Sequence, residues 1–228
     1  MGDDEGLFKR AAREADEMAA GVKEQGEGYA LYRYPSYEAY KAVQTAGNKA
    51  KLKRQFVKES HIAALSDYLS ARGEVRFGLC HGTRRGAEQA WFRAHLPGTP
   101  EVIGTEISDT ATDFPHTVQW DFHDANPDWT GRADFVYSNS WDHAFDPEKA
   151  FSAWIDTLAP GGVMMLDHTR DQTPETSNAL DPFGASLDHL TGLLARLLEG
   201  RGRLLEPLDF RKTNKEYRAV VVIAEKTR

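Results

Sequence analysis

Short β-type runs alternate with helical patterns from residue 74 onward, and this order predicts an α/β domain with a mostly parallel sheet. The chain has 228 residues, of which 40% are apolar and 28% charged, and this suits one such domain with an accessory segment. The strands are expected at residues 74–80, 102–106, 117–120, 133–138, 163–167, 204–210 and 219–225. In such sheets ligands bind beyond the carboxyl ends of the strands, so the residues just after each strand carry most of the functional information.

Helical patterns fill most of the connections between these strands. Asp146 can cap a helix that has Pro147 at its first position, and Ser60 can cap a helix that ends at Gly73. Further helices are expected at residues 84–96 and 187–198. The connection 122–132 is too short for a full helix, and the last two expected strands resemble a hairpin, which predicts an antiparallel final strand.

The first 58 residues differ in composition from the rest of the chain. Residues 1–27 are charged and alanine-rich, with the thin apolar stripe of a surface helix. Residues 28–58 carry five tyrosines followed by five basic residues. We therefore expect residues 1–58 to form a helical lid and residues 59–228 to form the α/β domain.

Within this lid, Ser36 can cap a helix that stops at Gly47. Aromatic faces bury apolar substrates and attract cations, which makes three tyrosines candidates for substrate binding: Tyr29, Tyr32 and Tyr37. The basic run 49–58 reads either as a solvated helix face or as a place for an anionic substrate.

Composition excludes several classes of protein. No apolar run approaches the roughly 18 residues of a membrane span, and the acidic N-terminus lacks the basic start of a secretory signal. One cysteine excludes an internal disulfide and a zinc site built from cysteines. The net charge of −7 argues against binding to nucleic acid by overall charge. The expectation is a cytoplasmic protein.

Ligand-facing signals follow three successive strands. Gly78, Gly82 and Gly86 in the first loop allow a sharp turn and a close approach of the backbone to a ligand. Glu106 ends the second expected strand, where a carboxylate can accept both ribose hydroxyls of a nucleoside. Asp121 follows the third strand, where it can accept from an adenine amino group. Together these signals predict a nucleoside site.

The same segments resemble the class I S-adenosylmethionine (SAM)-dependent methyltransferases. Residues 76–83, Arg-Phe-Gly-Leu-Cys-His-Gly-Thr, overlay the first motif of that family, and residues 134–143 overlay its fourth-strand motif. Residues 158–162, Leu-Ala-Pro-Gly-Gly, match its turn before the fifth strand. The resemblance implies a Rossmann-like, seven-stranded sheet that is mostly parallel with an antiparallel last strand, and SAM as the cofactor.

The resemblance also implies the residues of the cofactor site, which are Gly78, Cys80, His81, Gly82, Glu106, Ile107, Asp121, Phe122 and Asn139. The chain departs from the family at the end of the first strand. Gly78 stands where the family has an acid that holds the methionine ammonium, and Cys80 replaces the first glycine of the loop. Asp142 is then a candidate to hold the ammonium.

Three side chains after the fourth and fifth strands are candidate catalytic groups that accept a proton: His143, His168 and Asp142. Each histidine also has a non-catalytic interpretation: His143 would only shape the pocket, and His168 would be a polar loop residue. Asp142, Asp167 and His168 resemble the magnesium site of catechol-type methyltransferases. In that class the carboxylate directly follows its strand, whereas residues 138–141 intervene here, so no metal is expected.

The predicted function is transfer of a methyl group from SAM to an oxygen or nitrogen of a small molecule, with an anionic substrate and a homo-oligomer left open. The family's signature for methylating nucleic-acid bases is absent. Two alternatives remain: another reaction of SAM, such as cyclisation or lysis that releases methylthioadenosine, and a non-catalytic nucleotide-binding partner in a complex.

Overall fold

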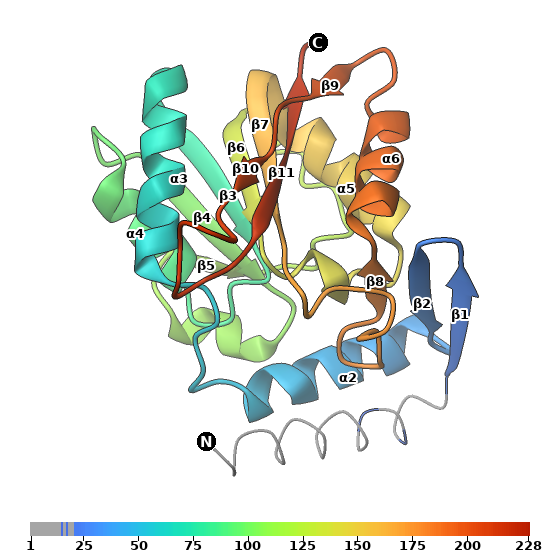
Figure 1. Cartoon of the computed structure of the whole chain (residues 1–228). Helices are drawn as coiled ribbons and strands as arrows, with labels where there is room; N and C mark the ends of the chain where they lie inside the picture. The colour runs from blue at the N-terminus through green and yellow to red at the C-terminus, as the bar shows by residue number, and fades with distance from the viewer. Residues whose placement is uncertain (1–14, 16, 18–20) are drawn as a thin grey trace.

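A single large sheet forms the centre of the molecule, a computed structural model that describes residues 15, 17 and 21–228 (Figure 1). Its strands are β3 (Phe77–His81), β4 (Glu101–Glu106), β5 (Thr117–Gln119), β6 (Ala133–Ser138), β7 (Leu158–His168), β9 (Gly202–Leu204), β10 (Leu208–Asp209) and β11 (Val220–Lys226). Their order is β10-β11-β7-β6-β3-β4-β5, with β9 also paired to β11. Strands β3 to β7 run parallel, and β11 is antiparallel to β7, as the sequence predicts.

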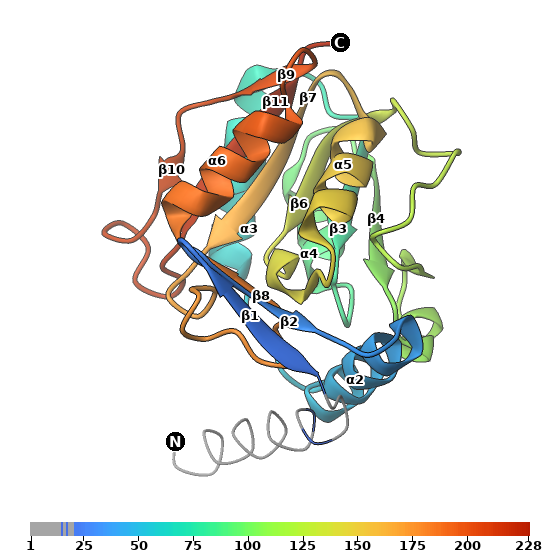
Figure 2. The same ribbon diagram turned by 90° about the vertical axis from the view of Figure 1, so that its right-hand side faces the viewer.

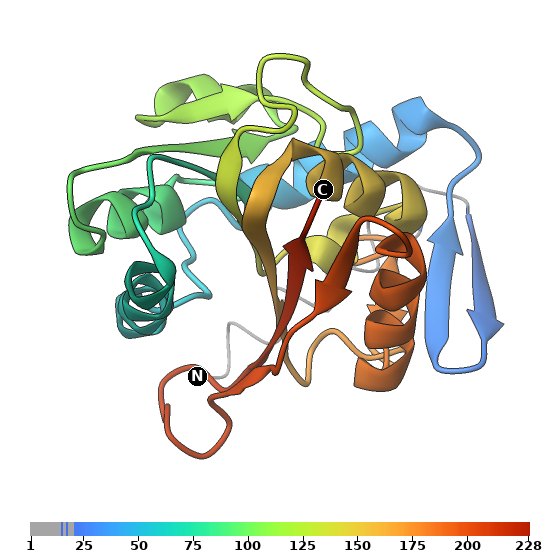
Figure 3. The same ribbon diagram turned by 90° about the horizontal axis from the view of Figure 1, so that it is seen from above.

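Helices cover both faces of this sheet (Figures 2 and 3). The helices are α3 (Glu59–Arg72) and α4 (Ala87–His95) on one face, and α5 (Pro147–Thr157) and α6 (Leu187–Leu197) on the other. On β6, Phe135 and Tyr137 point into the core under α3 and α4, and Val136 points into the core under α5 and α6. This alternation follows from the two-residue period of a strand, so both faces are buried.

Local signals fix several boundaries as predicted. Helix α5 begins at Pro147, and the Asp146 carboxylate accepts from the backbone N–H of Lys149 at 3.0 Å. Residues 120–132 contain no helix. Two short 3₁₀ helices, η1 (Asp109–Asp113) and η2 (Trp141–His143), follow β4 and β6. None of the described helices is long and apolar enough to cross a membrane.

The closing strands differ from the prediction in one respect. The expected strand 204–210 is divided into β9 and β10, and both pieces pair with β11. Pro207 lies between them and has no N–H to donate to a neighbouring strand, which explains the interruption. The sheet therefore has eight strands rather than seven.

A second, small sheet lies outside the central one and corrects the helical prediction for residues 1–27. Strands β1 (Val22–Gly26) and β2 (Tyr29–Arg33) form an antiparallel hairpin, and β2 pairs with β8 (Phe183–Ala185). Residues 22–26 are thus strand, because they pair with residues 29–33 in a hairpin that closes between Gly26 and Tyr29. Of the earlier residues, Ala15 and Glu17 are helical, and the rest of the predicted surface helix lies outside the described residues.

Helix α2 (Tyr37–Ala50) runs across the carboxyl ends of the parallel strands (Figure 1). Ser36 caps it as predicted, with its hydroxyl accepting from Ala39 N at 3.2 Å. The predicted stop at Gly47 is wrong, because the helix continues to Ala50. A Cβ at Gly47 would lie 2.5 Å from a methyl carbon of Leu180, so glycine serves close packing here. The predicted cap of α3 is also wrong: Lys58 precedes the helix, and Ser60 bonds to Glu216.

Gly78 has a packing role in β3 that can be measured. A Cβ there would lie 2.1 Å from the buried ring of Phe135, which packs on Phe92 with ring centroids 4.6 Å apart. Gly78→Ala should therefore lower the free energy of unfolding in urea by about 1–3 kcal/mol. Gly192→Ala is the matched control, since Gly192 lies in α6 with no atom within 4 Å of the added methyl, and it should raise that free energy by about 0.5–1 kcal/mol. Equal stability of Gly78→Ala and the wild type would contradict this packing.

Candidate cofactor and catalytic site

A cavity lies between α2 and the carboxyl ends of the parallel strands. Its lining residues are Tyr40, Gln44, Gly47, Asn48, Lys51, Gly82, Arg84, Glu106, Ile107, Asp121, Phe122, Ser140, His143 and Leu180. Its volume is about 40 Å³, room for a few water molecules at roughly 10–15 Å³ each. A neighbouring hollow of about 310 Å³ shares Ile107 and Asp121 with it and is also lined by Tyr37 and Trp120.

Glu106 ends β4 at the inner wall of this cavity. Its carboxylate accepts from the backbone N–H groups of Ser108 at 3.0 Å and Arg84 at 3.2 Å, and from the side chain of Asn48. Burial raises the pKa of Glu106, and these hydrogen bonds together with the Arg84 charge oppose the rise. The side chain is thus held in one place with its oxygens at the cavity.

Asp121 follows β5 and joins the cavity to the neighbouring hollow. Its carboxylate accepts from His123 through the backbone N–H at 2.9 Å and the ring Nδ1 at 2.7 Å, and from the Tyr37 hydroxyl at 2.9 Å. Burial acts to raise the pKa of Asp121, but the bonds from His123 and Tyr37 outweigh it and hold that pKa below its usual value. Asp121 is therefore an anion beside both spaces.

The loop between β3 and α4 passes close to the loop after β6. Gly82 has φ +73°, and a Cβ there would lie 2.7 Å from the Cβ of Ser140, so only glycine fits without strain. Arg84 lines the cavity, and burial lowers the pKa of its guanidinium. The sequence reasoning passed over both Arg84 and Ser140.

The other predicted loop residues lie in the protein core and not at the cavity. Gly78 and Cys80 are buried in the middle of β3, where they pack under α3 and α4. His81 points to the opposite face, stacks on Trp154 with ring centroids 4.7 Å apart, and bonds to Thr105 at 2.8 Å. Burial lowers the pKa of His81 to about 3. None of the three residues lines the cavity, and their assignment to the cofactor site stays a prediction.

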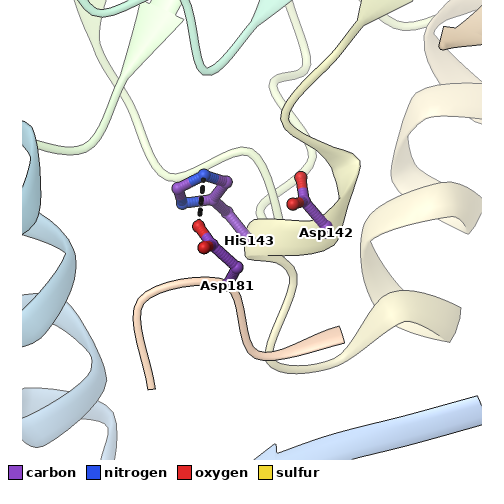
Figure 4. A group of neighbouring side chains, drawn as sticks. All are labelled: Asp142, His143 and Asp181. Carbon is purple, nitrogen blue, oxygen red and sulfur yellow. Dashed lines mark ion pairs between the residues drawn. The ribbon is translucent and has the colours of Figure 1, made fainter. Parts of the chain in front are cut away.

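Asp142 and His143 meet Asp181, which comes from the loop before β8 (Figure 4). One possible ligand atom of each side chain lies within 4.8 Å of the other two, and His143 Nε2 is 3.3 Å from an Asp181 oxygen. The ammonium of Lys51 lies 3.6 Å from the same oxygen. The cluster therefore contains two carboxyl groups, an imidazole and a cation.

Burial determines the charges of this cluster. It lowers the pKa of His143 to about 4, with Asp181 opposing the shift and Lys51 adding to it. It raises the pKa of Asp142, and the nearby Asp181 raises it further. Burial also acts to raise the pKa of Asp181, but Lys51 and His143 hold it below its usual value. At neutral pH the cluster thus has a neutral imidazole beside an ionised Asp181.

One face of α2, together with the residue after its end, supplies cavity residues that the sequence did not predict. Gln44, Asn48 and Lys51 recur at helical spacing and are only 6%, 8% and 7% exposed. Lys51 belongs to the basic run 49–58, for which the sequence predicts either a solvated helix face or a place for an anionic substrate. Polar residues at that spacing share one face of a helix, and this face can point either to a site or to solvent. The sequence alone does not distinguish the two, whereas burial in the structure does.

The remaining predicted residues are distributed around the site. Tyr37 lines the hollow, whereas Tyr29 bonds to Glu24 and packs on α6, and Tyr32 bonds to Gly21 N. Tyr29 and Tyr32 line neither the cavity nor the hollow, and a role for them in substrate binding stays a prediction.

Neither His168 nor Asn139 lines the cavity. His168 donates from Nε2 to the Ala185 carbonyl oxygen at 2.8 Å, and the Asn139 carbonyl accepts from Gln172. Asp167 is fully buried and bonds to His61 at 2.9 Å and to Tyr137. Asp142, Asp167 and His168 therefore do not form a common site.

No protein-family model and no curated protein sequence matches the chain. Solved structures do. The 1,6-didemethyltoxoflavin-N1-methyltransferase of Burkholderia thailandensis, solved with its namesake ligand and S-adenosylhomocysteine, is 14% identical with a TM-score of 0.62, over 90% of this chain and 99% of that one. The N-methyltransferase NodS of Bradyrhizobium japonicum with S-adenosylhomocysteine is 14% identical with a TM-score of 0.59, over 81% and 99%.

A TehB-like SAM-dependent methyltransferase from Corynebacterium glutamicum is also similar, 14% identical with a TM-score of 0.53, over 81% of this chain and 96% of that one. These likenesses show that the chain has the Rossmann-like fold of SAM-dependent methyltransferases. At such low identity the shared property is the fold, so the role of each residue must be argued from its own contacts.

The charges around His143 give a test by NMR titration. In the wild type the ring should stay neutral from neutral pH down to about pH 5, because burial disfavours the imidazolium. Asp181→Asn should lower the His143 pKa further, since it removes the charge that favours the imidazolium. Lys51→Met should raise the His143 pKa, since it removes a positive charge that disfavours the imidazolium. A ring that titrates near its ordinary value in all three proteins would contradict this arrangement.

Proposed function

We propose that the protein is a SAM-dependent methyltransferase that methylates an oxygen or nitrogen of a small molecule. One observation carries the proposal: on a methyltransferase fold, Glu106 and Asp121 end two neighbouring strands and both face the cavity under α2. Parallel sheets bind ligands at this edge, and two acids there suit a nucleoside.

The donors and acceptors at this edge fit the cofactor. Glu106 would accept from the ribose hydroxyls, and Asp121 would accept from the adenine amino group in the neighbouring hollow. Ile107 and Phe122 would flank the adenine ring. Gly82 would let the backbone approach the methionine part.

The methionine part of SAM would be held by other residues than in the family. Gly78 stands where the family has the acid that binds the ammonium, and it lies in the core of β3. The cluster of Asp142 and Asp181 offers carboxyl groups for the ammonium. Arg84 and Lys51 line the cavity and would donate hydrogen bonds to the carboxylate of the methionine part.

When bound, SAM supplies a methyl group on a sulfonium, which is activated toward attack by a lone pair. The chain has to position the acceptor atom, exclude water and take its proton. His143 lines the cavity and is neutral at physiological pH, so its ring can receive that proton. Asp181 at 3.3 Å would then stabilise the imidazolium.

The cavity of about 40 Å³ is smaller than a nucleoside, so the bound cofactor would extend into the neighbouring hollow of about 310 Å³, and its entry would require movement of α2. We propose that residues 1–58 act as a lid over the domain of residues 59–228, with α2 as the closing element. Lys51 and Arg84 would favour an acceptor with a negative charge. A cytoplasmic location is part of the proposal, and the buried free thiol of Cys80 agrees with it.

The loss of the family's acid at Gly78 favours one alternative, in which SAM is cleaved or cyclised without an acceptor. Incubation with SAM and a cell extract separates the candidates by mass spectrometry. Formation of S-adenosylhomocysteine supports methyl transfer. Release of methylthioadenosine without an acceptor supports the alternative, and bound cofactor with no turnover supports a non-catalytic nucleotide-binding protein.

Glu106 provides the most direct test of the cofactor site. Glu106→Ala should weaken S-adenosylhomocysteine binding in calorimetry by roughly 1.5–3 kcal/mol, because charge-assisted hydrogen bonds to the ribose are lost. Glu101→Gln, a change at the exposed start of the same strand, should leave the affinity unchanged. Unchanged affinity of a folded Glu106→Ala would remove Glu106 from the site.

Methyl transfer should not need a metal ion, because Lys51 already supplies a cation to the carboxylate of Asp181. The formation of S-adenosylhomocysteine in the extract assay should survive dialysis against a chelator. Activity that disappears and returns with magnesium or another divalent ion would contradict this prediction. It would assign the ion to Asp142, His143 and Asp181.

A further inference from the structure

Gln44 of α2 contacts the candidate base directly. Its Oε1 lies 2.7 Å from His143 Nδ1, and its side chain is only 6% exposed. Helix α2 therefore does more than cover the cavity, because it provides a hydrogen-bond partner for one of the two nitrogens of the ring. Which nitrogen of a histidine carries the proton depends on such a partner.

Two neighbours determine how the Gln44 amide is oriented. Its Nε2 lies 3.0 Å from the backbone oxygen of Leu180, which can only accept a hydrogen bond. The same Nε2 lies 3.4 Å from the hydroxyl of Tyr34, which donates its own proton to the Ala179 carbonyl and so offers a lone pair. Both N–H groups of the amide thus have acceptors. With the amide reversed, Oε1 would face two oxygens.

The amide in turn determines the state of His143. Since Oε1 faces Nδ1 and can only accept, Nδ1 must carry a proton. In the neutral ring Nε2 then has the free lone pair, 3.3 Å from the Asp181 carboxylate, whose negative charge is paired with the ammonium of Lys51. The backbone oxygen of Leu180, and that of Ala179 through the Tyr34 hydroxyl, determine the orientation of the amide. The amide in turn determines which ring nitrogen carries the proton.

We propose that Gln44 is a positioning residue that makes Nε2 of His143 the catalytic base and does so only when α2 is closed. The inference rests on the proposed function, in which His143 takes the proton of the acceptor. Opening of α2 removes the acceptor from Nδ1, so the base is prepared only while the lid excludes water. The proton released by the acceptor would bind to Nε2, and the resulting imidazolium would lie between Gln44 Oε1 and the Asp181 carboxylate.

The experiment measures the tautomer of His143 in the full-length protein. Nitrogen-15 NMR distinguishes a protonated ring nitrogen from a free one, and His143→Gln assigns the signals. In the wild type, with and without S-adenosylhomocysteine, Nδ1 should be protonated and Nε2 free. Gln44→Met keeps the length of the side chain but has no amide, and it should lower the ratio of the Nδ1–H to the Nε2–H form by at least about fivefold, the effect of one net hydrogen bond.

Val43→Ala is the matched control, because Val43 is a fully buried neighbour on α2 that does not bond to His143. It loosens the packing of the helix and should leave the tautomer unchanged. A wild-type ring with its proton on Nε2, an unchanged ratio in Gln44→Met, or the same change in Val43→Ala would overturn the inference. Failure of the wild type to bind S-adenosylhomocysteine would instead count against the proposed function, and the tautomer would still test the role of Gln44.

Discussion

The polar face of α2 is buried against the carboxyl edge of the sheet, and the arrangement of the site depends on this contact. Buried polar groups are costly unless they are paired, so each side chain on this face needs a partner. The buried pairs are Gln44 with His143, Asn48 with Glu106, and Lys51, the residue after the helix, with Asp181. Tyr37 is 42% exposed and also bonds to Asp121. The helix therefore closes in one register, and the side chains that would bind the cofactor and substrate are the ones that hold it.

In the proposed mechanism, this contact joins a rigid part, the sheet, to a movable part, helix α2. The sheet places Glu106 and Asp121 at fixed points, because parallel strands end at one edge. The helix contributes hydrogen bonds and ion pairs, which would exchange with water at small net cost on opening, and it also buries Tyr40 and Val43. Such a lid can admit a nucleoside and still exclude water when it closes.

The elements predicted correctly have signals within a few residues. The strands of the central sheet, the cap at Asp146 and the acids Glu106 and Asp121 follow from alternation, capping and position after a strand. One missed feature, the hairpin of β1 and β2, is local in the sequence. The pairing of β2 with β8 and the burial of Lys51 beside Asp181 depend on remote partners, so neither could be predicted from its own segment.

Gly78 and Gln44 illustrate the same limit for the site. The glycine lies in a motif that suggests ligand contact, but the ring of Phe135 from a neighbouring strand occupies the space beside it. Gln44 looks like a residue of an exposed helix until Leu180 and His143 are placed next to it. Tertiary packing decides both cases, and the local sequence alone does not distinguish the alternatives.

Hydrogen exchange of the α2 amides, with and without S-adenosylhomocysteine, tests the central claim most directly. If α2 is a lid held by the site residues, its amides should exchange faster than those of α5 in the free protein, because the helix opens without unfolding the sheet. Bound S-adenosylhomocysteine should slow exchange in α2 and leave α5 unchanged. Binding of S-adenosylhomocysteine with no change in α2 would contradict the claim that this helix closes over the cofactor site.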